Sequence, residues 1–160
     1  MASIIELVAS YLNNPTVQLS SLELFGHTLL ITGGLFRLWA MNHLGRFFTF
    51  TLSIRERHQL ITDGPYAIVR HPSYTGLHAI ILGAGTIAFN GNFTKPIVGR
   101  DGLGGDVIRL CLGAVPCLAF FRGLAMARME TEEGMMRGAF GERWEEYARV
   151  TRFKLIPGLW

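Results

Sequence analysis

Residues 22–41 read LELFGHTLLITGGLFRLWAM, a run of 20 residues whose only charged side chains, Glu23 and Arg37, stand toward its two ends. An α-helix of about 20 apolar residues is long enough to cross the roughly 30 Å hydrocarbon core of a bilayer. Arginine near a helix end can extend its charged head to the lipid headgroups, so Arg37 is compatible with a span. This stretch therefore predicts a transmembrane helix.

Two further stretches predict spans of the same kind: YTGLHAIILGAGTIAF at residues 74–89 and DVIRLCLGAVPCLAFFRGLAM at residues 106–126. Across all 160 residues, 49% are hydrophobic and only 17% charged, whereas about a quarter of a soluble domain is charged. We expect one domain over residues 1–160, an all-α integral membrane helical bundle with about three full transmembrane helices. Residues 3–12 could add an N-terminal half-helix, which at about 15 Å is too short to span.

The basic residues outside these spans are unevenly distributed. None precede the first span, four lie in residues 42–73, two in residues 90–105 and six after residue 126. By the positive-inside rule, residues 42–73 and the tail face the cytosol. The net charge of +3 comes without a basic cluster, so it indicates anionic lipid headgroups as partners and no nucleic acid.

The tail has an apolar stripe at spacings of four, four and three, formed by Met136, Phe140, Trp144 and Tyr147. This period predicts a cytosolic C-terminal amphipathic helix lying along the membrane surface.

The cysteines and histidines give no sign of a metal centre. Cys111 and Cys117 are six residues apart, on different faces of a helix, so we expect buried reduced thiols. The five histidines show no paired ligand spacing, and we expect no metal.

The first polar motif is GPYAIVRHPSYTG at residues 64–76. Its prolines fix the backbone and Gly64 permits a turn. Tyr66, His71 and Tyr74 could supply stacking faces and hydrogen bonds to a flat, polar ligand. The alternative is an interface loop whose Tyr and Arg only anchor it among lipid headgroups.

The second motif is RMETEEG at residues 128–134. Arg128 and Glu132 are four apart and share a helix face, with Glu133 pointing elsewhere. The alternative is an ordinary surface ion pair worth about 0.3–0.5 kcal/mol.

Both motifs together carry a resemblance. HQLITDGPYAIVRHPSYTG at residues 58–76 is followed about 50 residues later by RMETEEGMMRGAFGERWEEY and then LIP. These blocks resemble the isoprenylcysteine carboxyl methyltransferase family of integral membrane enzymes, in a match running over about residues 45–157, roughly 70% of the chain. The resemblance implies methyl transfer from S-adenosylmethionine to the C-terminal carboxylate of a prenylated cysteine in proteins. It also implies a multi-pass protein of the endoplasmic reticulum membrane with its active site facing the cytosol.

Carried over by position, the resemblance implies that Arg128 binds the substrate carboxylate and forms the catalytic pair with Glu132. The cofactor contacts it implies are His58, Gln59, Leu60, Ile61, Tyr66, His71, Pro72, Ser73, Tyr74 and Glu132. We therefore expect the chain to fold back so that His71 and Glu132 become neighbours around one hollow. Gly83 and Gly85 would allow close backbone approach to the cofactor, or would pack small residues between helices.

The residue types suit this chemistry. A C-terminal carboxylate with a pKa of about 3.5 is ionised at neutral pH and attacks a sulfonium methyl group without a general base. The site needs only to desolvate and orient it, for which the fork of Arg128 is suited, while Glu132 counters the cofactor's positive charge. Two departures from the family pattern are the short segment ahead of the first span and Trp144 in place of the commoner tyrosine.

Alternative functions stay open at this point. A phospholipid N-methyltransferase would need a base to deprotonate its ammonium substrate and would have less use for Arg128. A truncated scaffold would keep the fold without binding cofactor. A nicotinamide-dependent reductase lacks support, because no glycine-rich strand-to-helix motif occurs. The physiological substrate, the preferred prenyl length and the oligomeric state are open as well.

Overall fold

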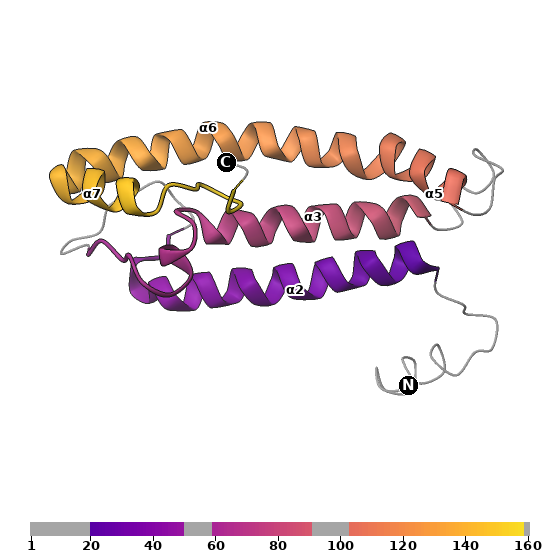
Figure 1. Ribbon diagram of the computed structural model, residues 1–160, viewed down its shortest axis with the longest axis horizontal. Helices are drawn as coiled ribbons and strands as arrows, with labels where there is room; N and C mark the ends of the chain where they lie inside the picture. Colours follow the sequence, from indigo (N-terminus) through magenta and orange to yellow (C-terminus); the bar gives the residue numbers. More distant parts are fainter. Residues whose placement is uncertain (1–19, 50–58, 91–102, 159–160) are drawn as a thin grey trace.

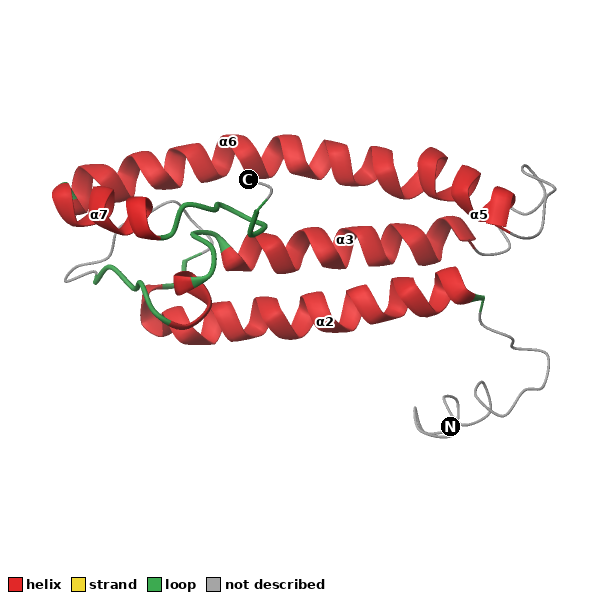
Figure 2. Cartoon of the chain, viewed as in Figure 1, coloured by secondary structure: helices red, strands yellow, loops and turns green. Residues whose placement is uncertain are grey.

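The computed structural model describes residues 20–49, 59–90 and 103–158, and within these ranges the chain forms helices and no β-strand (Figure 2). In chain order the elements are α2 (Ser21–Leu44), the 3₁₀ turns η1 (Gly45–Phe47) and η2 (Gly64–Ala67), α3 (Pro72–Asn90), α5 (Leu103–Arg109), the π-helical segment η3 (Leu110–Ala114), α6 (Val115–Phe140) and α7 (Glu142–Val150). Three long rods lie side by side, with α3 between α2 and the continuous rod of α5, η3 and α6 (Figure 1). The predicted all-α class is confirmed.

The first predicted span corresponds to α2. Its start is fixed by a capping box: the Ser20 hydroxyl accepts from the Glu23 amide at 3.2 Å, and the Glu23 carboxylate accepts from the Ser20 amide at 2.9 Å. The helix ends at Gly45, whose φ of 54° lies in the left-handed region that favours glycine. Local sequence therefore defines both ends of α2.

Two pairs of glycines bring α2 and α3 into backbone contact. A Cβ atom at Gly83 would lie 2.5 Å from the carbonyl oxygen of Gly26, and one at Gly76 would lie 2.6 Å from that of Gly33. The glycines are seven apart on each antiparallel helix, so both pairs fall on the contacting faces. Small residues of this kind allow helices to approach closely in membranes. Gly83 thus serves helix packing.

The third rod is longer than the predicted span and changes helix type within it. The π-helical turn precedes Pro116, which has no amide hydrogen and whose ring clashes with the carbonyl four residues earlier. Here the Phe89 ring covers Gly113, and a Cβ atom at Gly85 would lie 3.1 Å from the Cα of Ala114. Gly85, like Gly83, serves helix packing.

Among the described residues, two helical stretches are long and apolar enough to cross a membrane, Ser21–Phe47 and Leu110–Phe140. Their outward faces carry large apolar side chains such as Leu35 and Phe120, both more than half exposed. A full span by α3 stays a prediction, and residues 3–12 lie outside the described part of the chain. The expectation of two buried thiols is wrong, because Cys111 is exposed on the outside of the rod.

The predicted C-terminal amphipathic helix requires a correction. Its stripe is divided between two helices, because α6 ends at Gly141, whose φ of 53° is one that glycine adopts readily. Met136 and Phe140 belong to α6, whereas Trp144 and Tyr147 lie on α7 and are 3% and 6% exposed. These two rings pack inward on the protein, and a position of α7 along the membrane surface stays a prediction.

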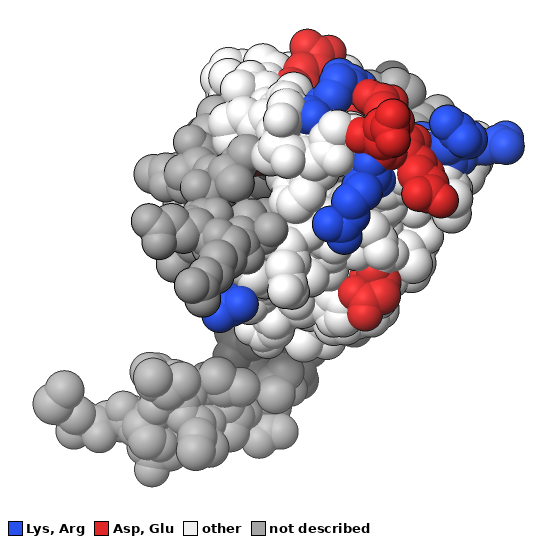
Figure 3. Space-filling model, turned by 90° about the vertical axis from the view of Figure 1, so that its left-hand side faces the viewer, with Lys and Arg blue, Asp and Glu red and all other residues white. Residues whose placement is uncertain are grey.

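The polar segments meet at one end of the bundle, on the left of Figure 1. The backbone amides of Arg70 and His71 donate to the carbonyls of Phe153 and Lys154, both at 2.9 Å, so the C-terminal tail is joined to the start of α3. Figure 3 views this end and shows basic and acidic side chains gathered on it. The described parts of residues 42–73, which are residues 42–49 and 59–73, thus share one end with the tail up to residue 158, as the distribution of basic residues predicted.

Candidate active site

A pocket of about 360 Å³ lies at this polar end, between the C-terminal end of α2, the start of α3 and the second half of α6. Every described residue of the predicted cofactor set lines it, and so does Arg128. His58 lies outside the described residues. The set is Gln59, Leu60, Ile61, Tyr66, His71, Pro72, Ser73, Tyr74 and Glu132.

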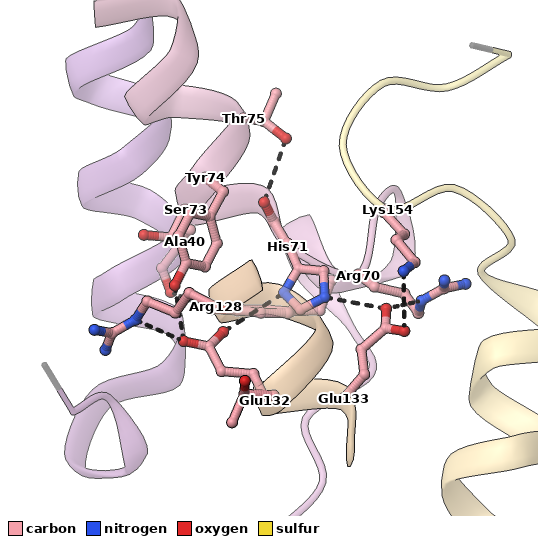
Figure 4. Close-up of polar contacts among 12 residues, drawn as sticks. Ala40, Arg70, His71, Ser73, Tyr74, Thr75, Arg128, Glu132, Glu133 and Lys154 are labelled. Atoms are coloured by element: carbon pink, nitrogen blue, oxygen red, sulfur yellow. Dashed lines mark hydrogen bonds and ion pairs between the residues drawn. The ribbon is translucent and has the colours of Figure 1, made fainter. Parts of the chain in front are cut away.

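His71 and Glu132 are neighbours across this pocket, as predicted. The Nδ1 atom of His71 lies 3.7 Å from a carboxylate oxygen of Glu132, and the Tyr74 hydroxyl donates to the other oxygen at 2.8 Å (Figure 4). Tyr74 and Glu132 are 58 positions apart in the chain. The loop motif and the α6 motif therefore form one site.

Arg128 and Glu132 share a face of α6, as their spacing predicted. The Nε atom of Arg128 donates to Glu132 at 3.2 Å, and the two side chains are 40% and 27% exposed. Because Tyr74 holds the same carboxylate and both members line the pocket, this is more than an isolated surface ion pair.

Glu133 belongs to a second network that the sequence analysis missed. Its carboxylate accepts from Arg70 Nε at 2.9 Å and His71 Nε2 at 3.1 Å, and it lies 3.4 Å from Lys154 Nζ (Figure 4). The side chain points away from Glu132, as expected, but it is only 11% exposed. His71 therefore stands between two carboxylates. Glu133 fixes the ring so that Nδ1 faces Glu132.

Comparison with known proteins accords with this geometry. Residues 24–98 match the sequence model of the isoprenylcysteine carboxyl methyltransferase (ICMT) family. The chain belongs to this family. It is 34% identical over 127 residues to protein-S-isoprenylcysteine O-methyltransferase B of Arabidopsis thaliana, a match that covers 78% of the chain and 54% of that relative.

Other family members give similar figures. The protein-S-isoprenylcysteine O-methyltransferase of Schizosaccharomyces pombe is 31% identical over 132 residues, covering 80% of the chain and 48% of the relative. A probable protein-S-isoprenylcysteine O-methyltransferase of Oryza sativa subsp. indica is 30% identical over 128 residues, covering 78% of the chain and 56% of the relative. The chain spans about half the length of these relatives.

Several pocket residues of this ICMT-family chain were not predicted. The end of α2 contributes an apolar wall and Arg37, whose Nη1 atom donates to the carbonyl and the hydroxyl of Ser73, each at 2.9 Å. The aromatic stripe of the tail was recognised, but its place in the pocket was not. The additional lining residues are Arg37, Leu44, Phe47, Phe48, Thr49, Arg70, Leu77, Met135, Met136, Trp144 and Tyr147.

Two tyrosines join the loop to its surroundings. The Tyr147 hydroxyl donates to the carbonyl of Tyr66 at 2.8 Å, and the Tyr66 hydroxyl reaches the carbonyl of Ala40 at 3.4 Å. Burial raises the pKa of both tyrosines above the ordinary value. Both phenols therefore stay neutral at physiological pH and act as hydrogen-bond donors.

Proposed function

We propose that this chain transfers a methyl group from S-adenosylmethionine to the C-terminal carboxylate of a prenylated cysteine in proteins. The observation that carries the proposal is the single pocket formed by the RHPSY turn and the Arg128–Glu132 pair. The names of the relatives, which are protein-S-isoprenylcysteine O-methyltransferases, support it further.

The residues of the pocket fit the cofactor. A volume of about 360 Å³ falls within the roughly 300–1,000 Å³ of small-molecule sites. Glu132 supplies a negative charge for a cationic ligand, and the aromatic lining residues offer ring faces to which a cation is attracted. When bound, the cofactor supplies a methyl group on a positively charged sulfur. Tyr74 holds Glu132 in place for that charge.

Arg128 would orient the acceptor carboxylate. This carboxylate, with a pKa of about 3.5, needs no general base at neutral pH. It does need to exchange its hydration for fixed donors, and a guanidinium provides two parallel ones. Glu132 anchors Arg128 through Nε, which leaves the planar fork pre-organised. The pair thus positions an anion beside a cation.

An apolar wall would hold the prenyl chain. Leu44 at the end of α2, and Phe47 and Phe48 just beyond it, line the pocket together with Leu77 and Met135. Transfer of each methylene of a prenyl group from water to such a wall contributes about 0.8 kcal/mol. The proposed substrate therefore matches both the polar and the apolar sides of the pocket.

The membrane setting belongs to the same proposal. We infer that α3 is the third span, that the polar end faces the cytosol, and that the protein resides in the endoplasmic reticulum membrane. Basic residues concentrated in residues 42–73 and in the tail support this orientation.

The test is a labelled-methyl assay on the purified chain in phospholipid vesicles with farnesylcysteine as acceptor. We expect base-labile methyl ester in the acceptor. Arg128→Ala should abolish it while cofactor binding, measured by calorimetry in detergent, largely survives. Arg122→Ala, an exposed arginine of α6 outside the pocket lining, should retain activity.

Three results would contradict the proposal. Label in phospholipid and not in the acceptor would indicate lipid N-methylation. A wild-type chain that binds no cofactor at millimolar concentration would indicate a scaffold. Full turnover by Arg128→Ala would remove the role assigned to that side chain.

A further inference from the structure

Arg37 is a second arginine in the pocket wall, on a different helix from Arg128. It projects from α2, whereas Arg128 projects from α6, and the first turn of α3 lies between them. Its Nη1 atom is bound at 2.9 Å by both the backbone oxygen and the hydroxyl of Ser73. The guanidinium is therefore held in one orientation by the turn that also carries His71 and Tyr74.

Most of the hydrogen-bonding capacity of Arg37 is not used by the described residues. A guanidinium carries five N–H donors, and in the described part of the chain its only hydrogen bonds are the two from Nη1 to Ser73. No carboxylate in the described part of the chain forms an ion pair with Arg37, which lies toward the polar end of the apolar stretch Ser21–Phe47. A ligand anion in the pocket would supply the missing partner.

The charges of the pocket wall indicate which anion. Arg70, a third arginine of the wall, is only 10% exposed and donates to Glu133 and to the carbonyls of Thr151 and Arg152. We therefore assign the ligand carboxylates to the other two arginines of the wall, Arg37 and Arg128. The proposed reaction brings two carboxylates into the pocket, that of the acceptor and that of the amino-acid part of the cofactor. Two ligand carboxylates thus meet two guanidinium groups.

We propose that Arg37 binds the amino-acid carboxylate of S-adenosylmethionine, so that Arg128 is left for the acceptor carboxylate. This assignment rests on the proposed function. Ser73 fixes Arg37 to the turn whose residues are the predicted cofactor contacts. The side chain of Arg128 is 40% exposed, so an acceptor arriving from outside can reach it.

The experiment compares S-adenosylmethionine with its decarboxylated analogue, which lacks only that carboxylate. Dissociation constants are measured by calorimetry in detergent for the wild type, Arg37→Gln, Arg128→Gln and the control Arg122→Gln. Because hydrogen bonds to charged groups are strong, we expect the wild type to bind the analogue roughly 10- to 100-fold more weakly. Arg37→Gln should bind both ligands equally, whereas Arg128→Gln and Arg122→Gln should keep the wild-type ratio.

The ratio of the two constants is taken within one variant, so a loss of folded protein does not move it. Arg37→Lys, which keeps the charge but loses the planar fork, should give an intermediate ratio. If Arg37→Gln kept the wild-type ratio of the two dissociation constants, the assignment would be overturned. If, in addition, its KM for farnesylcysteine were raised, Arg37 would serve the acceptor and not the cofactor. Absence of cofactor binding by the wild type would instead refute the proposed function itself.

Discussion

Replacing Glu133 with glutamine tests whether the second network holds the site together. The carboxylate accepts from Arg70 Nε at 2.9 Å and from His71 Nε2 at 3.1 Å, and the Arg70 and Glu133 side chains are 10% and 11% exposed. Glutamine keeps the size of the side chain but removes the charge and one acceptor oxygen. Arg70 is then left nearly buried without its counter-ion.

The expected cost follows from these contacts. A hydrogen bond to a charged group contributes about 1.5–3 kcal/mol, and removing one partner of a buried ion pair costs about 3–5 kcal/mol. Arg70 keeps the carbonyls of Thr151 and Arg152, each at 2.9 Å. We therefore expect the lower end of the range, about 3 kcal/mol, which in a chain of this length lowers Tm by about 6–12 °C.

The assay is thermal unfolding in detergent, followed by circular dichroism. Glu130→Gln is the matched control, since Glu130 is an exposed glutamate of the same helix and its substitution should change stability by no more than about 0.5 kcal/mol. If the two variants melted together, Glu133 would not be a structural centre of the site.

The remaining predictions concern packing and pH. Gly83→Ala should lower the free energy of unfolding by about 1–3 kcal/mol, because its Cβ would lie 2.5 Å from a backbone oxygen. Gly34→Ala, whose Cβ would have nothing within 4 Å, should raise it by up to about 1 kcal/mol through better helix propensity. Equal Tm values for the two variants would contradict the glycine packing between α2 and α3. Burial raises the pKa of Tyr66 and Tyr147 above 10.0, so the folded state retains protons that the unfolded state releases. The contribution of these tyrosines to the free energy of unfolding should be complete below pH 10. Above pH 10 it should fall by up to about 1.4 kcal/mol per pH unit for each tyrosine. A Tm independent of pH from 9 to 11 would refute this.

The sequence predicted the rods well because each is a long apolar run, but it misled where one pattern crossed a turn. The spacing of Met136, Phe140, Trp144 and Tyr147 fits a single helix even though the chain bends at Gly141. The spacing of apolar residues depends only on which positions are apolar. A glycine between those positions does not change the spacing, although it can end a helix. The backbone conformation at Gly141 decided the outcome.

The site was predictable in its motifs and not in its supports. His71 and Glu132 were brought together by a resemblance that covers both motifs, whereas Glu133 and Arg37 depend on how α6 and α2 are rotated against α3. That rotation is set by contacts such as Gly33 with Gly76, which no local pattern reports. From the sequence alone, Arg37 is an arginine near the end of a predicted span, and nothing in the sequence indicates that it lines the pocket.

The two adjacent glutamates explain why the tail belongs to the site. Neighbouring residues of an α-helix project about 100° apart, so α6 presents Glu132 to the pocket and Glu133 to the segment that ends the chain. His71 contacts both carboxylates, and Lys154 lies 3.4 Å from the second. The tail is also held by the hydroxyl of Thr75, which donates to the Leu155 carbonyl at 2.7 Å. Displacing the tail would therefore remove Lys154 from Glu133 and the Lys154 carbonyl from the backbone amide of His71, even though the tail segment that makes these contacts does not line the pocket.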